Sequence, residues 1–235
     1  MFLDIDGTLL EIADRPDRVR IPSALPGLLG ALARQRDGAL ALISGRPLAE
    51  IDRLMRPWRG AAAGLHGSER RRADGGIERR LDTGAAAALD RIRPALRTLA
   101  AQDGGLILED KGLAVALHYR AAPQRAEEIL HWAGALQRRS GSALRLIAGK
   151  MVVEFQPCGA DKGATIAAFL AEPPFAGRVP VFVGDDVTDE DGFAEVARRH
   201  GIAIRVGAPM ATRASHALGS VAAVLAWLRG DGRAG

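Results

Sequence analysis

The sequence predicts an α/β protein with a parallel sheet, into which a smaller α+β domain is inserted. Two observations support this prediction. Near both ends of the 235-residue chain, short apolar runs alternate with segments of helical periodicity, which is typical of a parallel sheet with helices on its faces. Between them, a helix pattern followed by two strand patterns occurs twice, and each strand pair is joined by a turn containing glycine, which predicts antiparallel hairpins.

The first alternating region extends to about residue 65. Its apolar runs and helix signals predict, in order, a strand in MFLDI, a helix over 22–36, a buried strand in GALALIS, a helix over 47–55 and a third strand in GAAAGLHG. The arginine-rich stretch SERRRADGGIERRLD has a central DGG and reads as two solvated strands around a turn.

The middle region repeats the order αββ. We expect a helix over 85–101, strands in LILED and LAVALHYR, a helix over 123–139, and strands in ALRLIA and MVVEFQP. After CGADKG the first pattern resumes, with helices over 162–171, 190–200 and 215–228 and strands in VPVFVGDD and GIAIRVG. We therefore predict a core made of residues 1–79 and 158–235, with a separate domain at 80–157 inserted into it.

Composition narrows the function classes. The net charge of +4 is compatible with nucleic acid or with small anions, but aromatic residues make up only 4% and do not favour base stacking, so we expect no nucleic-acid partner. There is no apolar run of about 18 residues and no signal-peptide pattern, which predicts a cytoplasmic protein without a membrane span. A single cysteine, Cys158, fits a reducing compartment. We expect a monomer.

Charged and hydroxyl side chains follow the ends of several predicted strands and begin one helix. They are Asp4 and Asp6 in DIDGT, Ser44 and Arg46 in SGR, Lys162 in DKG, and Asp185, Asp186 and Asp189 in GDDVTDED. Ligands of open parallel sheets bind outside the carboxyl ends of the strands, so we expect these residues to meet. Several carboxylates cannot stay ionised in one pocket without a cation, and ligands that offer only oxygen favour Mg²⁺.

These residue types are suited to phosphoryl transfer. Lys162 and the cation would neutralise phosphate oxygens, and Ser44 would donate a hydrogen bond to one of them. A carboxylate could attack phosphorus to give an aspartyl-phosphate, while a second carboxylate would protonate the leaving sugar oxygen and later activate water. Gly7 allows the sharp turn that aims Asp4 and Asp6 into the same site.

DIDGT, Ser44, Lys162 and GDDVTD resemble, in order and across nearly the whole chain, the four motifs of haloacid dehalogenase (HAD)-like phosphatases. GLHGSE, LEDKGLAVALHYR, GKMVVEFQPCGADKG and GDDVTDEDGF look more specifically like the trehalose-6-phosphate phosphatases of that superfamily. The resemblance implies a Rossmann-like HAD core with an inserted C2-type cap. It also implies that Asp4 is the nucleophile, that Asp6 is the general acid/base, and that Asp4, Asp185 and the Asp6 carbonyl bind Mg²⁺, with Asp189 supporting the metal through water.

The same resemblance implies that the cap recognises the sugar and closes over the site. Lys150 and Glu154 would hydrogen-bond glucose hydroxyls. The further substrate-binding candidates are Gly45 and Arg46 in SGR, His66 at the cap hinge, and His118 and Arg120. The expected reaction is hydrolysis of trehalose 6-phosphate to trehalose and phosphate, the last step of trehalose biosynthesis. The first strand begins at the first residue, so we expect the start to be truncated relative to the family.

Simpler interpretations of each motif remain open. DIDGTL could be a strand followed by an Asp-Gly turn, and GDDVTDED an acidic helix N-terminus. Lys162 and Lys150 could be surface lysines, and His118 could lie on the polar face of a half-buried strand. The alternative functions are a phosphatase for sucrose phosphate or mannosyl-phosphoglycerate, a phosphosugar mutase or phosphotransferase, and a sugar-phosphate sensor without catalysis.

Overall fold

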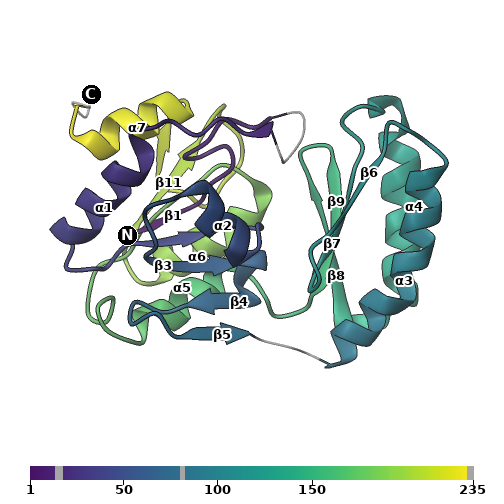
Figure 1. Ribbon diagram of the computed structural model, residues 1–235, viewed down its shortest axis with the longest axis horizontal. Helices are drawn as coiled ribbons and strands as arrows, with labels where there is room; N and C mark the ends of the chain where they lie inside the picture. The colour runs from purple at the N-terminus through teal and green to yellow at the C-terminus, as the bar shows by residue number, and fades with distance from the viewer. Residues whose placement is uncertain (14–17, 80–82, 232–235) are drawn as a thin grey trace. The chain divides into compact units, whose positions relative to one another are not determined.

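The computed structural model describes residues 1–13, 18–79 and 83–231, and the chain forms two compact units (Figure 1). Unit 1 comprises Met1–Arg79 and Asp161–Gly235, and unit 2 comprises Arg80–Ala160. The chain therefore returns to unit 1 at residue 161, whereas the sequence predicted this change at residue 158. Within each unit the α/β character agrees with the predicted fold class, which is confirmed.

Unit 1 is built on an eight-stranded sheet with the order β12-β11-β10-β1-β2-β3-β4-β5. Its strands are β1 (Phe2–Leu3), β2 (Ala41–Ile43), β3 (Ala61–Gly64), β4 (Glu69–Arg71), β5 (Ile77–Arg79), β10 (Val181–Gly184), β11 (Ile202–Val206) and β12 (His216–Leu218). The strands from β12 to β3 pair in parallel, and β4 and β5 extend the sheet as an antiparallel hairpin. The predicted Arg-rich hairpin is therefore the edge of the main sheet, as far as residue 79.

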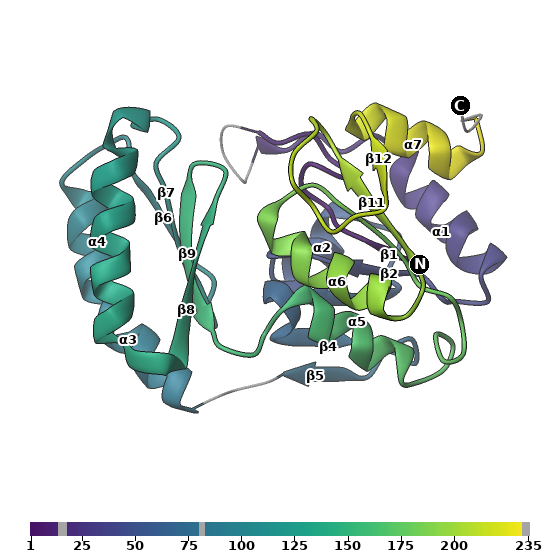
Figure 2. The same ribbon diagram turned by 180° about the vertical axis from the view of Figure 1, so that it is seen from behind.

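Helices cover both faces of this sheet (Figure 2). The helices α1 (Leu25–Gln35), α2 (Leu48–Leu54) and α7 (Val221–Arg229) pack on one face with a core of mainly aliphatic side chains. The opposite face carries α5 (Lys162–Leu170) and α6 (Glu190–Arg198) with an aromatic core that includes Phe2, Phe169 and Phe182. Throughout the described ranges, the helices are all too short or too polar to cross a membrane.

The predicted helix over 215–228 is wrong in its first part. Residues His216–Leu218 form β12, which pairs in parallel with β11, and α7 begins only at Val221. The reason is the position of the helix cap. Ser220, in an extended conformation, accepts a hydrogen bond from the amide of Ala223, and this N-cap starts the helix after Gly219 rather than at Ser215.

Unit 2 is a four-stranded antiparallel sheet with two helices on one face. The strands, in the order β6-β7-β9-β8, are β6 (Ile107–Asp110), β7 (Val115–His118), β8 (Leu144–Gly149) and β9 (Val152–Pro157). The helices α3 (Thr83–Ala101) and α4 (Ala126–Arg139) bury alternate strand residues such as Leu117, Val153 and Phe155. Because successive strand residues point to opposite faces, Glu109, His118 and Glu154 belong to the other face. The predicted αββαββ order is observed.

Candidate active site

The polar motifs of unit 1 lie together because their strands are neighbours. β1 lies between β10 and β2, and all three are parallel, so the residues that follow them share one edge of the sheet. Asp4 follows β1 and its amide donates to the Val183 carbonyl at 2.9 Å. Ser44 follows β2, and Asp185 follows β10. This is the edge at which parallel sheets bind ligands.

Three carboxylates and one ammonium group form a buried cluster at this edge. Oxygens of Asp4, Asp185 and Asp189 all lie within 4.8 Å of one another. Lys162, the first residue of α5, donates from Nζ to Asp4 Oδ1 at 2.7 Å and to Asp189 Oδ1 at 2.6 Å. The four residues are at most 5% exposed. Because Lys162 is buried among these carboxylates, the alternative interpretation of Lys162 as an ordinary surface lysine is wrong.

The electrostatics of the cluster follow from this crowding. Burial raises the pKa of Asp4 well above its usual value; Asp189 and Asp185 add to the rise, and the charge and hydrogen bond of Lys162 oppose it. Burial by itself lowers the pKa of Lys162, but the charges and hydrogen bonds of Asp189 and Asp4 outweigh it, and the pKa is raised. Lys162 therefore stays protonated beside the three carboxyl groups, whose crowding is part of what raises the pKa of Asp4.

Asp189 organises the loop that carries Asp185. Its Oδ2 accepts hydrogen bonds from the backbone amides of Asp185 and Asp186, both at 2.9 Å, while Oδ1 accepts from Lys162. Asp189 ends the short 3₁₀ helix η5 (Val187–Asp189) and is fully buried. Both oxygens of Asp189 are thus engaged in holding β10, η5 and α5 together. Its predicted link to a metal through water stays a prediction.

Gly7 is required by the close approach of Asp185. Gly7 has φ +83°, in the left-handed region that favours glycine, and a Cβ at this position would lie 2.1 Å from Asp185 Oδ2. The Asp-Gly sequence therefore does more than turn the chain after β1. It leaves the space into which the Asp185 carboxylate points.

The side chain of Asp6 is paired with Arg46. Arg46 Nε lies 2.6 Å from Asp6 Oδ2 and Nη2 lies 2.7 Å from Oδ1, which is a bidentate ion pair. Nη1 of Arg46 donates to Glu50, in the first turn of α2. The Arg46 amide donates to Ser44 Oγ at 3.1 Å, so the buried Ser44 and Arg46 are part of one loop.

Gly45 and His66 are in contact within unit 1. The His66 amide donates to the Ser44 carbonyl at 3.0 Å, and a Cβ on Gly45 would lie 2.6 Å from His66 Nε2. His66 is buried and has φ 53°, an uncommon conformation for a residue with a side chain. It therefore lies beside the Ser44 loop of unit 1, and its predicted place at the cap hinge stays a prediction.

Unit 2 has two polar side-chain pairs on the face of its sheet that the helices leave uncovered. Lys111 Nζ lies 2.8 Å from Glu154 Oε2, with the two side chains 9% and 10% exposed, respectively. His118 Nε2 lies 2.8 Å from Glu109 Oε2. Burial raises the pKa of Glu109, but the hydrogen bond of His118 and the charge of Lys111 outweigh it and lower the pKa below its usual value. Such enclosed polar groups are suited to hydrogen bonding with a sugar.

Arg120 and Lys150 lie at one end of the same sheet. Arg120 Nη2 donates to the Lys150 carbonyl at 3.1 Å, and Lys150 is in the exposed turn between β8 and β9. Their substrate-binding roles stay predictions. The pairing across the sheet connects Ala116 on β7 with Glu154 on β9, so Glu154 lies centrally and Lys150 lies at the rim.

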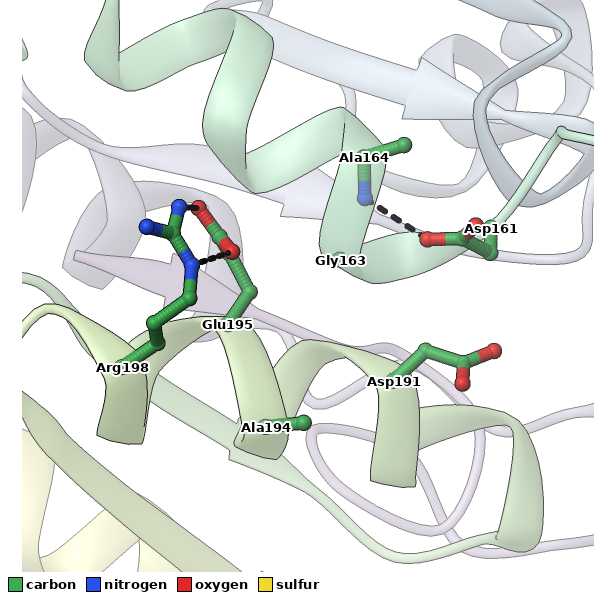
Figure 3. A pocket seen from close by; sticks show the side chains of 7 residues that line it. All are labelled: Asp161, Gly163, Ala164, Asp191, Ala194, Glu195 and Arg198. Carbon is green, nitrogen blue, oxygen red and sulfur yellow. Dashed lines mark hydrogen bonds and ion pairs between the residues drawn. The ribbon is translucent and has the colours of Figure 1, made fainter.

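A separate hollow of about 260 Å³ lies between α5 and α6 (Figure 3). Its charged side chains are already engaged. Glu195 pairs with Arg198 at 2.8 and 2.9 Å, and Asp161 caps α5 by accepting from the Ala164 amide at 2.6 Å. The candidate active site is therefore the cluster at the strand ends and not this hollow.

Comparison with known proteins agrees with the motifs. A family model described as trehalose-phosphatase matches residues 2–221. The chain belongs to the trehalose-phosphatase family. It is 46% identical to a probable trehalose-phosphate phosphatase of Sinorhizobium fredii, over 94% of this chain and 82% of that protein. It is also 46% identical to a trehalose-6-phosphate phosphatase of Escherichia coli, over 97% of this chain and 84% of that protein.

A solved structure extends this family likeness to the whole fold. The crystal structure of a trehalose-6-phosphate phosphatase related protein matches 97% of this chain and 94% of its own, with 26% identity and a TM-score of 0.80. The sequence resemblance to trehalose-phosphatases and the expected phosphatase activity of this family are thus confirmed.

The donor set of the trehalose-phosphatase site fits a hard divalent cation. Asp4, Asp185 and Asp189 offer only carboxylate oxygens, which Mg²⁺ prefers, and their separation of at most 4.8 Å lets several reach one ion. A cation bound among these carboxyl groups would favour their ionised forms and so oppose the rise in the pKa of Asp4. Asp185 points into the space that Gly7 leaves open.

Sequence reasoning missed Glu109 and Lys111, the partners of His118 and Glu154, and Glu50, the partner of Arg46. The signal for Glu50 was its spacing of four residues from Arg46, which places the two on one face of a helix start. Lys111 could have been noticed as a charged residue between two apolar strand patterns. Its partner Glu154 is 43 residues away in the sequence, so the motif itself does not identify the pair. Such a pairing depends on strand register, which the motif search did not supply.

Proposed function

We propose that this chain hydrolyses trehalose 6-phosphate to trehalose and inorganic phosphate through an aspartyl-phosphate on Asp4, as the last step of trehalose biosynthesis. The observation that carries the proposal is the buried cluster of Asp4, Lys162, Asp185 and Asp189 at the carboxyl edge of the sheet. Family membership and the named relatives support the choice of substrate.

The first half of the reaction uses Asp4 and Asp6. A carboxylate oxygen of Asp4 attacks phosphorus, the bond between phosphorus and the sugar oxygen breaks, and Asp6 gives its proton to that leaving oxygen. Lys162 and Ser44 hold phosphate oxygens. Burial alone would lower the pKa of Lys162, but Asp189 and Asp4 outweigh burial and raise it, which keeps Lys162 charged. Asp4, Asp185 and the Asp6 carbonyl would hold Mg²⁺, which would neutralise charge at the phosphoryl group.

The second half returns the enzyme to its starting state. Water attacks phosphorus, the bond to the Asp4 oxygen breaks, and Asp6 accepts the proton from water. Asp4 leaves as a carboxylate and inorganic phosphate is released. A phosphotransferase or mutase would have to exclude water at this step.

Unit 2 is proposed as the cap that recognises the sugar. Two polar pairs lie on the open face of its sheet, Lys111 with Glu154 and His118 with Glu109, and their hydrogen-bonding groups match sugar hydroxyls. Lys150, Arg120 and His66 are further candidates. The monomeric state, the cytoplasmic location and the absence of a nucleic-acid partner stay predictions.

The test is phosphate release in the presence of Mg²⁺ from trehalose 6-phosphate, sucrose 6-phosphate, glucose 6-phosphate and a chromogenic aryl phosphate. We expect the highest kcat/KM for trehalose 6-phosphate and loss of activity in Asp4→Asn. A trehalose 6-phosphate rate no better than that of glucose 6-phosphate would reject the substrate. Full activity of Asp4→Asn would reject the mechanism.

A further inference from the structure

The carboxylate of Asp6 has a fixed orientation. Both of its oxygens accept from one guanidinium, at 2.6 Å from Arg46 Nε and 2.7 Å from Nη2, although the Asp6 side chain is 35% exposed. A carboxylate held by two parallel hydrogen bonds cannot rotate without breaking both. Each oxygen still has a second lone pair with which it can accept a proton.

Arg46 is itself held in place at both ends. Its side chain is 8% exposed, and Nη1 donates to Glu50. Its backbone amide donates to Ser44 Oγ at 3.1 Å, and its carbonyl accepts from the Leu65 amide at 3.1 Å. The guanidinium is therefore anchored through the Ser44 loop on one side and through α2 on the other.

Charge favours the same arrangement. Burial alone lowers the pKa of Arg46, but the hydrogen bonds and charges of Asp6, followed by those of Glu50, outweigh burial and raise it. Arg46 is thus a permanent cation between two carboxylates. It cannot exchange protons itself, but it can determine where the Asp6 carboxylate points.

We infer that Arg46 is a positioning residue that aims Asp6, and that Glu50 is a second positioning residue that holds Arg46. The inference rests on the proposed function, in which Asp6 accepts a proton when water hydrolyses the aspartyl-phosphate. In that step a bond forms between water oxygen and phosphorus, the bond from phosphorus to Asp4 breaks, and the water proton moves to Asp6. An Asp6 carboxylate that rotates freely would meet the attacking water less often in the required orientation.

The test separates the two half-reactions with an aryl phosphate, whose leaving group needs little protonation. Single-turnover measurements in the presence of Mg²⁺ give the rate of aryl alcohol release, which reports phosphorylation of Asp4, and the rate of phosphate release, which reports hydrolysis. For Glu50→Gln we expect the ratio of hydrolysis to phosphorylation rates to fall on the order of tenfold, because a neutral amide oxygen replaces the carboxylate that accepts the charge-assisted hydrogen bond from Arg46. Arg46→Lys cannot form the bidentate pair, so its ratio should fall further, by roughly a hundredfold.

Arg53→Gln is the matched control. Arg53 Nη2 also lies 3.4 Å from Glu50 Oε1, but the Arg53 side chain is 60% exposed. Its loss should therefore leave the ratio of the two rates unchanged. Both rate constants are measured on one preparation. An unfolded fraction lowers the amplitudes of both signals but leaves the two rate constants, and therefore their ratio, unchanged. Glu50 is 21% exposed, which makes Glu50→Gln the milder change if Arg46→Lys folds poorly.

A ratio within about twofold of wild type in Glu50→Gln and Arg46→Lys would overturn the inference. Equal slowing of both steps would also overturn it, because it would assign Arg46 to phosphate binding or to the fold. Failure of the wild type to form any phosphoenzyme would be a different result, since it would reject the proposed mechanism itself.

Discussion

Replacing Lys162 by methionine should destabilise unit 1 when no divalent cation is present. Lys162 Nζ lies 2.7 Å from Asp4 and 2.6 Å from Asp189, and the side chains are 3%, 7% and 0% exposed, respectively. Removing one partner of a buried ion pair costs about 3 to 5 kcal/mol, because the remaining charge is left uncompensated. At about 2 to 4 °C for each kcal/mol, the unfolding temperature should fall by roughly 6 to 20 °C.

The assay is thermal unfolding followed by circular dichroism, with a chelator and then with Mg²⁺. We expect the difference between wild type and Lys162→Met to shrink in Mg²⁺, since a bound cation neutralises part of the same negative charge. Lys150→Met is the control, because Lys150 is an exposed lysine in unit 2 and its loss should change stability by less than about 0.5 kcal/mol. If Lys162→Met unfolds at the wild-type temperature in chelator, the account of a charged, tightly coupled cluster is wrong.

Three further predictions concern the turn after β1 and the sheet of unit 2. Gly7→Ala places a Cβ 2.1 Å from Asp185 Oδ2 at φ +83°, so an Mg²⁺ titration of activity should show weaker binding and kcat lowered by more than about tenfold. Glu154→Ala should raise KM for trehalose 6-phosphate far more than KM for an aryl phosphate, since the aryl ester carries no glucose hydroxyls for Glu154 to bind. Burial alone would raise the pKa of Glu109, but His118 and Lys111 lower it. Ionised Glu109 therefore stabilises the fold above pH 4.5, and this contribution is lost on acidification. The difference in unfolding free energy between wild type and Glu109→Gln should shrink below that pH.

Each of these has a result that would contradict it. Gly159 has φ +84° with no atom within 4 Å of an added Cβ, so Gly159→Ala measures backbone strain without the clash. If it impaired Mg²⁺ binding as much as Gly7→Ala, contact with Asp185 would not be the cause. Equal KM increases on both substrates would remove Glu154 from the sugar site. A constant difference between wild type and Glu109→Gln from pH 6 to about pH 3 would show that the interactions of ionised Glu109 with His118 and Lys111 add nothing to stability.

The order of the elements could be predicted because hydrophobic periodicity and turn residues are local signals. The apolar runs GALALIS and VPVFVGDD predicted the buried strands β2 and β10. Because ligands bind at the carboxyl ends of parallel strands, the same pattern predicted that Asp4 and Asp185 meet at one edge of the sheet. The error in residues 215–220 came from choosing Ser215 over Ser220 as the helix start. Either serine could cap a helix, and the strand pairing of His216–Leu218 with β11, together with the N-cap hydrogen bond of Ser220, distinguishes them.

The ion pairs within the site could not be predicted in the same way. The pairing of Asp6 with Arg46 joins residues 40 apart, and that of Lys162 with Asp189 joins residues 27 apart. Which oxygen accepts from which nitrogen depends on side-chain rotamers in the packed loops. A motif indicates that these residues belong to one site, and the structure adds that Asp6 faces Arg46 while Asp189 faces Lys162.

The most direct measurement for the proposed mechanism is trapping of the phosphoenzyme. The protein is mixed with trehalose 6-phosphate labelled with ³²P in the presence of Mg²⁺, quenched in acid within one turnover, and digested for peptide mapping. We predict label on the peptide that begins the chain, at Asp4, and no label in Asp4→Asn. Label on another residue, or phosphate release by wild type with no labelled protein at any time, would contradict nucleophilic attack by Asp4.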